Sequence, residues 1–246
     1  MDKSINQPRF VLYLDIMGFK ERVARNSMED LLDELSAFNK KITDIINSVN
    51  KTADNGEGII TDDSSEAQSS SDIVTDDQRA TIECVQFSDS IILFSKSNSE
   101  NDLVAITNAA KEIMFTAITM DKPIPLKGSL AEGDVVSDLS KQLFFGQALI
   151  DAFILEEDVQ CYGIVVHHTA EGSVKRMKHS EYRDVKVPFK NGGFIQHYEL
   201  PWYKGRTEDT LKALELFRLN VSNYPRKYID HTKELIASYQ AEAGEN

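Results

Sequence analysis

The order in which strand-like and helix-like segments follow one another constrains the fold of this chain more than any other feature. Short β-rich runs alternate with longer stretches whose apolar residues recur at helical spacing, and two of the strand runs are separated only by a short polar connection typical of a hairpin. In chain order the sequence predicts a strand over 9–14, a helix over 28–49, strands over 81–85 and 91–94, a helix over 102–119 and a strand over 126–136.

This β-α-β-β-α-β order is that of a ferredoxin-like unit, so we predict an α+β fold. An α/β extension follows, with predicted elements that are a helix over 145–158, a strand over 162–168, a hairpin over 185–200 that turns near 190–193, and helices over 207–220 and 228–242. We interpret residues 1–246 as one domain with a helical tail from about 207, since a chain of this length can bury one large core.

One segment differs from the rest in composition. Residues 51–79 are rich in acids and serines and poor in large apolar side chains, so they cannot offset the entropy of ordering and are predicted to be a mobile insertion. The whole chain carries a formal charge of −13, which disfavours binding to nucleic acid. A small anionic ligand remains compatible with that charge, because a few cations or a metal ion can reverse the local field.

Neither a membrane span nor a signal peptide is expected. The strongest apolar run, Phe10–Leu14, is far shorter than a span requires, and the first residues are polar. The two cysteines, Cys84 and Cys161, lie in apolar runs and are expected to be buried thiols. We therefore expect a soluble cytoplasmic protein.

Two aspartates are the strongest candidates for chemistry. Asp15 directly follows the first strand, and Asp89 lies at the tight connection of the hairpin. In the predicted topology the first strand lies beside that hairpin, so the two carboxylates can converge at one end of the sheet. Two carboxylates, a backbone carbonyl and substrate phosphates suit Mg²⁺. Taken singly, either aspartate is more often a capping or turn residue.

Gly18 and Phe19 follow Asp15 and begin a helix. A glycine turn at this point exposes main-chain N–H groups near a helix start, where a polyphosphate can bind.

With these motifs in place, the sequence resembles the class III nucleotidyl cyclases over about residues 9–200. The resemblance lies in four short motifs in the family's order: 10–19, 87–91, 127–133 and 187–200. It implies that Asp15, the Ile16 carbonyl and Asp89 bind two Mg²⁺ or Mn²⁺ ions, and that Gly18 and Phe19 cover the phosphates. It also implies a homodimer whose active sites lie across the interface.

The sequence departs from the purine cyclases of this class at the positions that read the base and stabilise the transition state. Val85 and Leu143 stand where the family pattern has adenine-reading Lys and Asp, and Ile150 and Ile154 stand where it has Asn and Arg. The second lysine of the late hairpin is replaced by Gly192, which leaves Lys190 as a nearby substitute. A pocket without those groups would leave the polar edge of adenine unpaired.

Residues 145–156 look instead like the bacterial pyrimidine cyclases of the Pycsar anti-phage systems, which have a Gly-x-Ala-x-x-x-Ala-x-x-x-Glu helix here. That resemblance implies a homodimer that makes cyclic UMP or cyclic CMP from UTP or CTP, and a downstream effector that the product activates. The alternatives are an adenylate or guanylate cyclase with other base readers, and a catalytically silent module that only binds a nucleotide.

Several charged residues have two interpretations each. Lys127 and Lys190 are candidate phosphate contacts or ordinary surface lysines, and Arg22 and Arg25 are candidate phosphate contacts or surface charges of a helix. His167 and His168 are expected to alternate between the faces of a strand and not to form a metal pair. Glu156 is expected at a solvated helix end or as an anchor of that helix.

Overall fold

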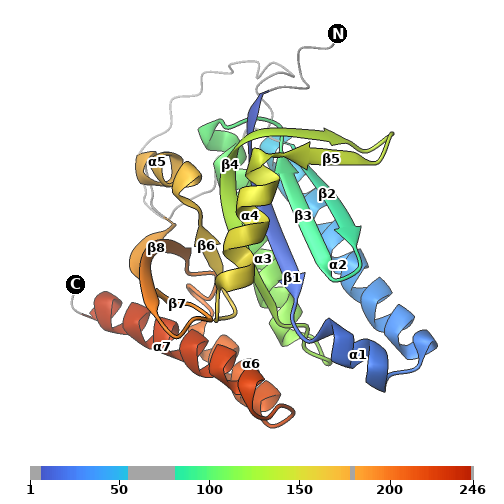
Figure 1. Ribbon diagram of the computed structural model, residues 1–246, viewed down its shortest axis with the longest axis vertical. Coiled ribbons are helices and arrows are strands. Elements are labelled where there is room, and N and C mark those ends of the chain that lie inside the picture. The colour runs from blue at the N-terminus through green and yellow to red at the C-terminus, as the bar shows by residue number, and fades with distance from the viewer. Residues whose placement is uncertain (1–6, 55–80, 178–180, 245–246) are drawn as a thin grey trace, which may run out of the picture.

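A mixed eight-stranded sheet organises the structure, a computed structural model that describes residues 7–54, 81–177 and 181–244 (Figure 1). The first half contains β1 (Pro8–Ile16), α1 (Phe19–Arg25), α2 (Met28–Asp54), β2 (Ile82–Phe87), β3 (Ser90–Ser95), α3 (Glu100–Thr119) and β4 (Leu126–Asp138). The second half contains β5 (Leu143–Gly146), α4 (Gln147–Asp158), β6 (Ile164–Val166), α5 (His168–Arg176), β7 (Arg183–Pro188), β8 (Phe194–Leu200), α6 (Thr207–Arg218) and α7 (Tyr224–Gly244).

The strands run in the order β2-β3-β1-β4-β6-β8-β7, and β5 pairs with β4 outside this path. β1 is antiparallel to both β3 and β4, which places it in the middle of the ferredoxin-like core. The predicted β-α-β-β-α-β order and the α+β class are therefore confirmed.

The two faces of β1 explain why helices cover both sides of the sheet. Alternate residues of a strand point to opposite faces. Phe10, Leu12 and Leu14 join a core with α2 and α3, whereas Val11 and Tyr13 pack against Ala148 and Ala152 of α4. Asp15 continues the second set, so it belongs to the α4 side of the sheet.

The predicted helix over 145–158 is wrong in its first residues. Leu143–Gly146 form β5, which pairs with Val135–Asp138, and α4 starts only at Gln147. Gly146 marks the change with φ +153°, and a Cβ at this position would lie 2.4 Å from the carbonyl oxygen of Asp134. The strand must therefore end in a glycine before the helix can begin.

The predicted strand over 162–168 is also wrong at both ends. β6 contains three residues, and the polar segment after it forms α5, which the sequence did not indicate. His167 precedes this helix as its N-cap, with its side chain accepting from the main-chain N–H of Thr169. The rings of His167 and His168 are therefore 4.1 Å apart and do not alternate between faces of a strand.

The acidic segment begins later than predicted, because residues 51–54 are the last turn of α2. The remainder of the predicted insertion, 55–79, lies outside the described residues. Among the helices of the described ranges, none has an apolar stretch that would let it traverse a bilayer.

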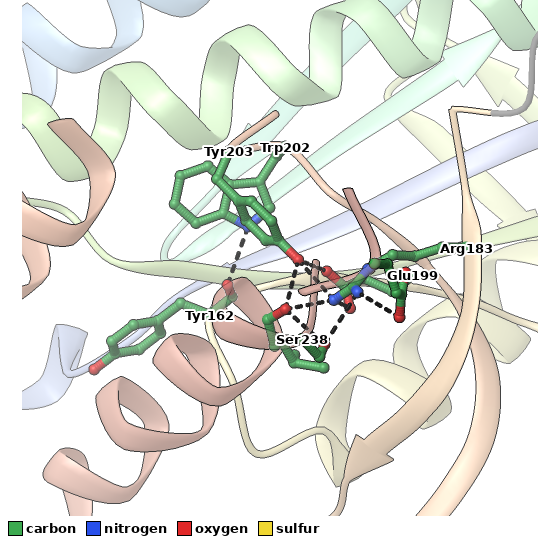
Figure 2. Close-up of polar contacts among 8 residues, drawn as sticks. Tyr162, Arg183, Glu199, Trp202, Tyr203 and Ser238 are labelled. Atoms are coloured by element: carbon green, nitrogen blue, oxygen red, sulfur yellow. Dashed lines mark hydrogen bonds and ion pairs between the residues drawn. The ribbon is translucent and has the colours of Figure 1, made fainter. Parts of the chain in front are cut away.

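The C-terminal helices α6 and α7 follow a buried aromatic pair, Trp202 and Tyr203. The indole N–H of Trp202 donates to the carbonyl of Tyr162 at 3.1 Å (Figure 2). α6 begins at Thr207 as predicted, and α7 begins at Tyr224, four residues before the predicted start.

Arg183 of β7 connects the late hairpin to α7 (Figure 2). Its guanidinium donates to the Tyr203 hydroxyl at 2.9 Å, to the Leu235 carbonyl at 2.6 Å and to the Ser238 hydroxyl at 3.0 Å. It also lies 3.3 Å from the carboxylate of Glu199, which is only 2% exposed. This network fixes α7 against the hairpin β7–β8.

Candidate active site

Asp15 lies at the end of the central strand, beside residues of both neighbouring strands. It is half-buried, and its register partners are Ser90 of β3 and Lys127 of β4. A carboxylate in this position therefore has neighbours on both adjacent strands, β3 and β4.

Asp89 reaches the same place from the β2–β3 turn. The turn contains Ser88 with φ +57°, a left-handed conformation that closes the tight connection. The main-chain N–H of Ile16 donates to the carbonyl of Asp89 at 2.8 Å, which ties the end of β1 to the turn. We call Asp15, Ile16 and Asp89 the aspartate edge.

Some charges around the aspartate edge raise the pKa of Asp15 and others lower it. Burial raises the pKa of Asp15 above its usual value, and the negative charge of Asp89 raises it further. The positive charges of Lys127 and Lys190 lower it. The edge therefore combines two mutually repelling carboxylates with two nearby cations.

Gly18 and Phe19 stand where β1 turns into α1. Gly18 has φ +75°, and a Cβ added there would meet no atom within 4 Å, so the turn is open to solvent. Phe19 packs its ring against the main core as the first residue of α1. The structure thus places an open glycine turn three residues from Asp15, and the role of its amides in binding phosphate remains a prediction.

Lys127 is not a surface lysine. Its side chain is 3% exposed, and its ammonium lies 2.7 Å from the carboxylate of Glu156, which is equally buried. The same ammonium donates to the main-chain carbonyls of Glu156 at 2.6 Å and Glu157 at 3.3 Å. The expectation of a solvated helix end at Glu156 is therefore wrong.

Lys190 lies at the tip of the hairpin β7–β8 and is exposed. Its main-chain N–H donates to the carbonyl of Asp158 at 2.8 Å, which anchors the tip to the end of α4, and Gly192 completes the turn with φ +85°. The ammonium is thus held near the aspartate edge by a fixed backbone but stays accessible to a ligand.

The Arg22 side chain is bound by other residues of the protein, away from the aspartate edge. Its guanidinium donates to the carboxylate of Glu34 and to the carbonyl of Pro123, so it links α1, α2 and the segment before β4. Arg25 is exposed in the last turn of α1. Arg22 is therefore a structural residue, which differs from both interpretations suggested by the sequence, a phosphate contact or a surface charge.

Sequence reasoning did not assign a role to Tyr13. This residue lies two positions before Asp15 on the same face of β1, and its hydroxyl is 2.5 Å from the Ser90 hydroxyl. Burial raises the pKa of Tyr13, so the phenol stays protonated. The period-two alternation of β1, applied backwards from Asp15, is the signal that points to it.

An apolar surface adjoins the site. The outer face of α4 and the strand β5 expose large hydrocarbon side chains, each between 40% and 59% accessible. We define the α4–β5 surface by these residues, which are Leu143, Phe145, Ile150, Phe153 and Ile154. The ring of Phe153 also touches Tyr13 edge-on, with centroids 5.5 Å apart, so this surface reaches the β1 side of the site.

Within the described residues, no group of three or more histidine, cysteine, aspartate or glutamate side chains is arranged to hold a metal ion. The aspartate edge offers two carboxylates. Mg²⁺ commonly binds through one or two carboxylates together with substrate phosphates and water, so the donor set at this edge fits such an ion.

Comparison with known proteins identifies the fold. One similar solved structure is the guanylate cyclase domain of RhGC from Catenaria anguillulae in complex with GTP, with a TM-score of 0.53 and 14% identity over 79% of this chain and 96% of that one. Another is the monomeric guanylyl cyclase domain of the RhoGC fusion protein from Blastocladiella emersonii, with a TM-score of 0.52 and 14% identity over 80% of this chain and 95% of that one. The adenylyl cyclase CyaB from P. aeruginosa is also similar, with a TM-score of 0.51 and 17% identity over 79% of this chain and 94% of that one. No protein-family model and no curated protein matches the sequence.

These neighbours are catalytic domains of class III nucleotidyl cyclases, and the chain described here has the class III cyclase fold. At such low identity the likeness concerns the fold alone.

Proposed function

We propose that this protein is a nucleotidyl cyclase that converts UTP or CTP into the 3′,5′-cyclic monophosphate and pyrophosphate. The observation that carries this proposal is the meeting of Asp15 and Asp89 at one edge of the sheet, tied by the hydrogen bond from Ile16 to Asp89. The class III cyclase fold and the motif resemblance support it.

The reaction is an intramolecular phosphoryl transfer. The ribose 3′-oxygen forms a bond to the α-phosphorus, the bond from that phosphorus to the bridging oxygen of the β-phosphate breaks, and the hydroxyl proton passes to water. Negative charge develops on the equatorial oxygens and on the leaving pyrophosphate, so most of the catalysis consists of positioning and charge neutralisation.

Asp15, the Ile16 carbonyl and Asp89 would hold two Mg²⁺ or Mn²⁺ ions. When bound, such ions lower the pKa of the attacking hydroxyl and neutralise the developing charge. Divalent cations also relieve the repulsion between Asp15 and Asp89 that raises the pKa of Asp15.

The triphosphate would bind beside this edge. The amides that follow the open turn at Gly18, including that of Phe19, and the exposed ammonium of Lys190 would contact the β- and γ-phosphates. Lys127 is excluded from this set because its ammonium is already held by Glu156 and two carbonyls.

Two observations favour a pyrimidine over a purine. The positions that read adenine in the purine cyclases are Val85 and Leu143 here, and neither side chain can hydrogen-bond to a base. The resemblance of α4 to the Pycsar pyrimidine cyclases agrees with this choice.

A homodimer is part of the proposal. The α4–β5 surface exposes five large apolar side chains on neighbouring elements, and exposed apolar side chains grouped in this way are typical of a protein interface. A second copy packed there would cover the patch and would close the site from the side of α4.

By the same resemblance, the product would be a second messenger that activates an effector in bacterial anti-phage defence, made by a cytoplasmic enzyme. The acidic segment has no proposed role.

Incubation with each of the four nucleoside triphosphates and Mn²⁺, followed by mass spectrometry of the products, tests the activity. We expect cyclic UMP or cyclic CMP as the main product, and no product in EDTA. A cyclic purine as main product would refute the pyrimidine assignment. If neither the wild type nor Asp15→Asn turns over any nucleotide, the protein is a silent binding module.

A further inference from the structure

The pair formed by Lys127 and Glu156 is the most deeply buried ion pair next to the aspartate edge in the described part of the chain. Both side chains are 3% exposed, and they join β4 to the last turn of α4 across 29 residues of sequence. Taking two charges out of water is costly, so a pair in this position needs a reason beyond stability.

The surroundings of Lys127 account for its position. It is the register partner of Asp15, and its stem crosses the α4 side of β4. The ammonium meets the carbonyls of Glu156 and Glu157, which belong to the end of α4, where main-chain acceptors lack helical partners and the helix dipole is negative. One cation therefore closes the C-terminus of α4 and neutralises Glu156.

A second contact fixes the same helix one turn earlier. The Ser129 hydroxyl, on the same face of β4, donates to the carbonyl of Ala152. Two polar contacts from alternate residues of β4 thus fix the position of α4 along its axis and its rotation about that axis. The outer face of α4 carries Ile150, Phe153 and Ile154 of the α4–β5 surface.

We infer that Lys127 and Glu156 are a positioning pair, which fixes α4 and the adjoining end of β1 so that Asp15 is held in its productive place, and that Lys127 does not bind the substrate. The inference rests on the proposed function for its kinetic readout only. A residue that acts by placing another should alter kcat more than KM, and its loss should be repaired by any pair that restores the packing.

The test compares Lys127→Met, Glu156→Leu and the double variant, assayed below the melting temperature of each. Either single variant leaves one buried charge without its partner, and we expect a fall in melting temperature and in kcat of about 10-fold or more, with KM within about 2-fold. The double variant replaces the ion pair by hydrocarbon and is expected to recover most of both quantities.

Lys190→Met is the matched control, because Lys190 is the exposed lysine at the same site. We expect it to raise KM for the triphosphate without changing the melting temperature. If the double variant is as stable as the wild type but keeps a raised KM like that of Lys190→Met, Lys127 contacts the substrate and the inference is wrong.

The structural part of the test does not need turnover. If the wild type cyclises no nucleotide, the proposed function fails, and the pair is judged by melting temperature and by hydrogen exchange at the end of α4 and at Ile16. Non-additive effects and restored protection in the double variant support the inference, whereas additive effects overturn it. Should the double variant not fold, Glu156→Gln, which keeps an acceptor for Lys127, must lower kcat less than Glu156→Leu.

Discussion

The main-chain N–H of Ile16 donates to the carbonyl oxygen of Asp89 at 2.8 Å, which joins the end of β1 to the β2–β3 turn. Together with the pairing of Asp15 and Ser90, this bond holds two aspartates, 74 positions apart in the chain, at the same sheet edge. The proposed catalytic chemistry depends on that placement, and the predictions below test it and the elements that support it.

Replacement of Asp15 by asparagine should separate catalysis from folding. The change removes a proposed metal ligand and also the like-charge repulsion with Asp89. We expect turnover to fall by about 100-fold or more, while the melting temperature stays equal or rises. Steady-state kinetics and calorimetry on one preparation measure both quantities. A large drop in melting temperature would mean that Asp15 is structural.

Titration of Asp15 should be displaced to higher pH. Burial and the charge of Asp89 raise its pKa above the usual 3.8, so in the metal-free protein its carboxyl takes up a proton at a higher pH than an ordinary aspartate does. Since the proton competes with the metal, Mn²⁺ affinity should weaken as the pH falls toward that range. Carbon-13 NMR of the aspartate carboxyls gives the midpoint.

Removal of the Lys190 charge should shift this titration in a known direction. Its charge lowers the pKa of Asp15, so Lys190→Met should move the midpoint further upward. A midpoint that stays in place or moves downward would contradict the position assigned to the Lys190 ammonium.

Charge on the α4–β5 surface should prevent dimerisation. Ile150 and Ile154 are 50% and 55% exposed, so Ile150→Glu with Ile154→Glu should fold as a monomer and lose activity. Leu219→Glu, at an equally apolar and 80% exposed position after α6, is the control. Sedimentation velocity distinguishes the species. If the double variant sediments as the wild type does, a dimer through this surface is ruled out.

Gly128 should tolerate no side chain. A Cβ there would lie 2.4 Å from the carbonyl oxygen of Tyr13 and 2.5 Å from a methyl group of Leu14, both on β1. We expect Gly128→Ala to lower the free energy of unfolding by about 2 kcal/mol. Gly244→Ala, where a Cβ meets nothing within 4 Å, should change it by less than about 0.5 kcal/mol. If urea unfolding gave the same change in free energy for Gly128→Ala and Gly244→Ala, β1 and β4 would have to lie further apart than described.

Loss of Arg183 should loosen α7. Arg183→Met leaves the buried carboxylate of Glu199 without its ion-pair partner and should cost about 3 kcal/mol. Lys175→Met breaks the exposed pair with Glu171, which solvent screens, and should cost much less. Thermal unfolding and hydrogen exchange in α7 give the comparison, and similar costs for the two variants would show that the Arg183 network does not anchor the helix.

The core strands could be predicted because each is a local pattern. Phe10–Leu14 is apolar and β-rich, and Asp15 ends the pattern abruptly, which also marked it as a candidate ligand. β5 was missed because its apolar residues merge with the pattern of α4, and only the pairing with β4 separates the two. α5 was missed because its segment is short and mostly polar, and its buried face consists only of the small residues Ala170, Ser173 and Val174.

The partner of Lys127 depends on tertiary structure. Nothing in the local sequence tells whether a lysine on β4 points to solvent, to a phosphate or to a carboxylate on a helix that crosses the strand. Its pairing with Glu156 results from the crossing of α4 over β4, as does the exposure of Ile150 and Ile154 on the opposite side of that helix.

The most direct test of the central claim is a titration with Mn²⁺ followed by electron paramagnetic resonance, in the presence of a non-hydrolysable pyrimidine nucleoside triphosphate. We predict two bound Mn²⁺ per subunit in the wild type and a loss of binding in both Asp15→Asn and Asp89→Asn. Retention of wild-type stoichiometry and affinity by either variant would contradict this prediction, because that aspartate would then hold no metal.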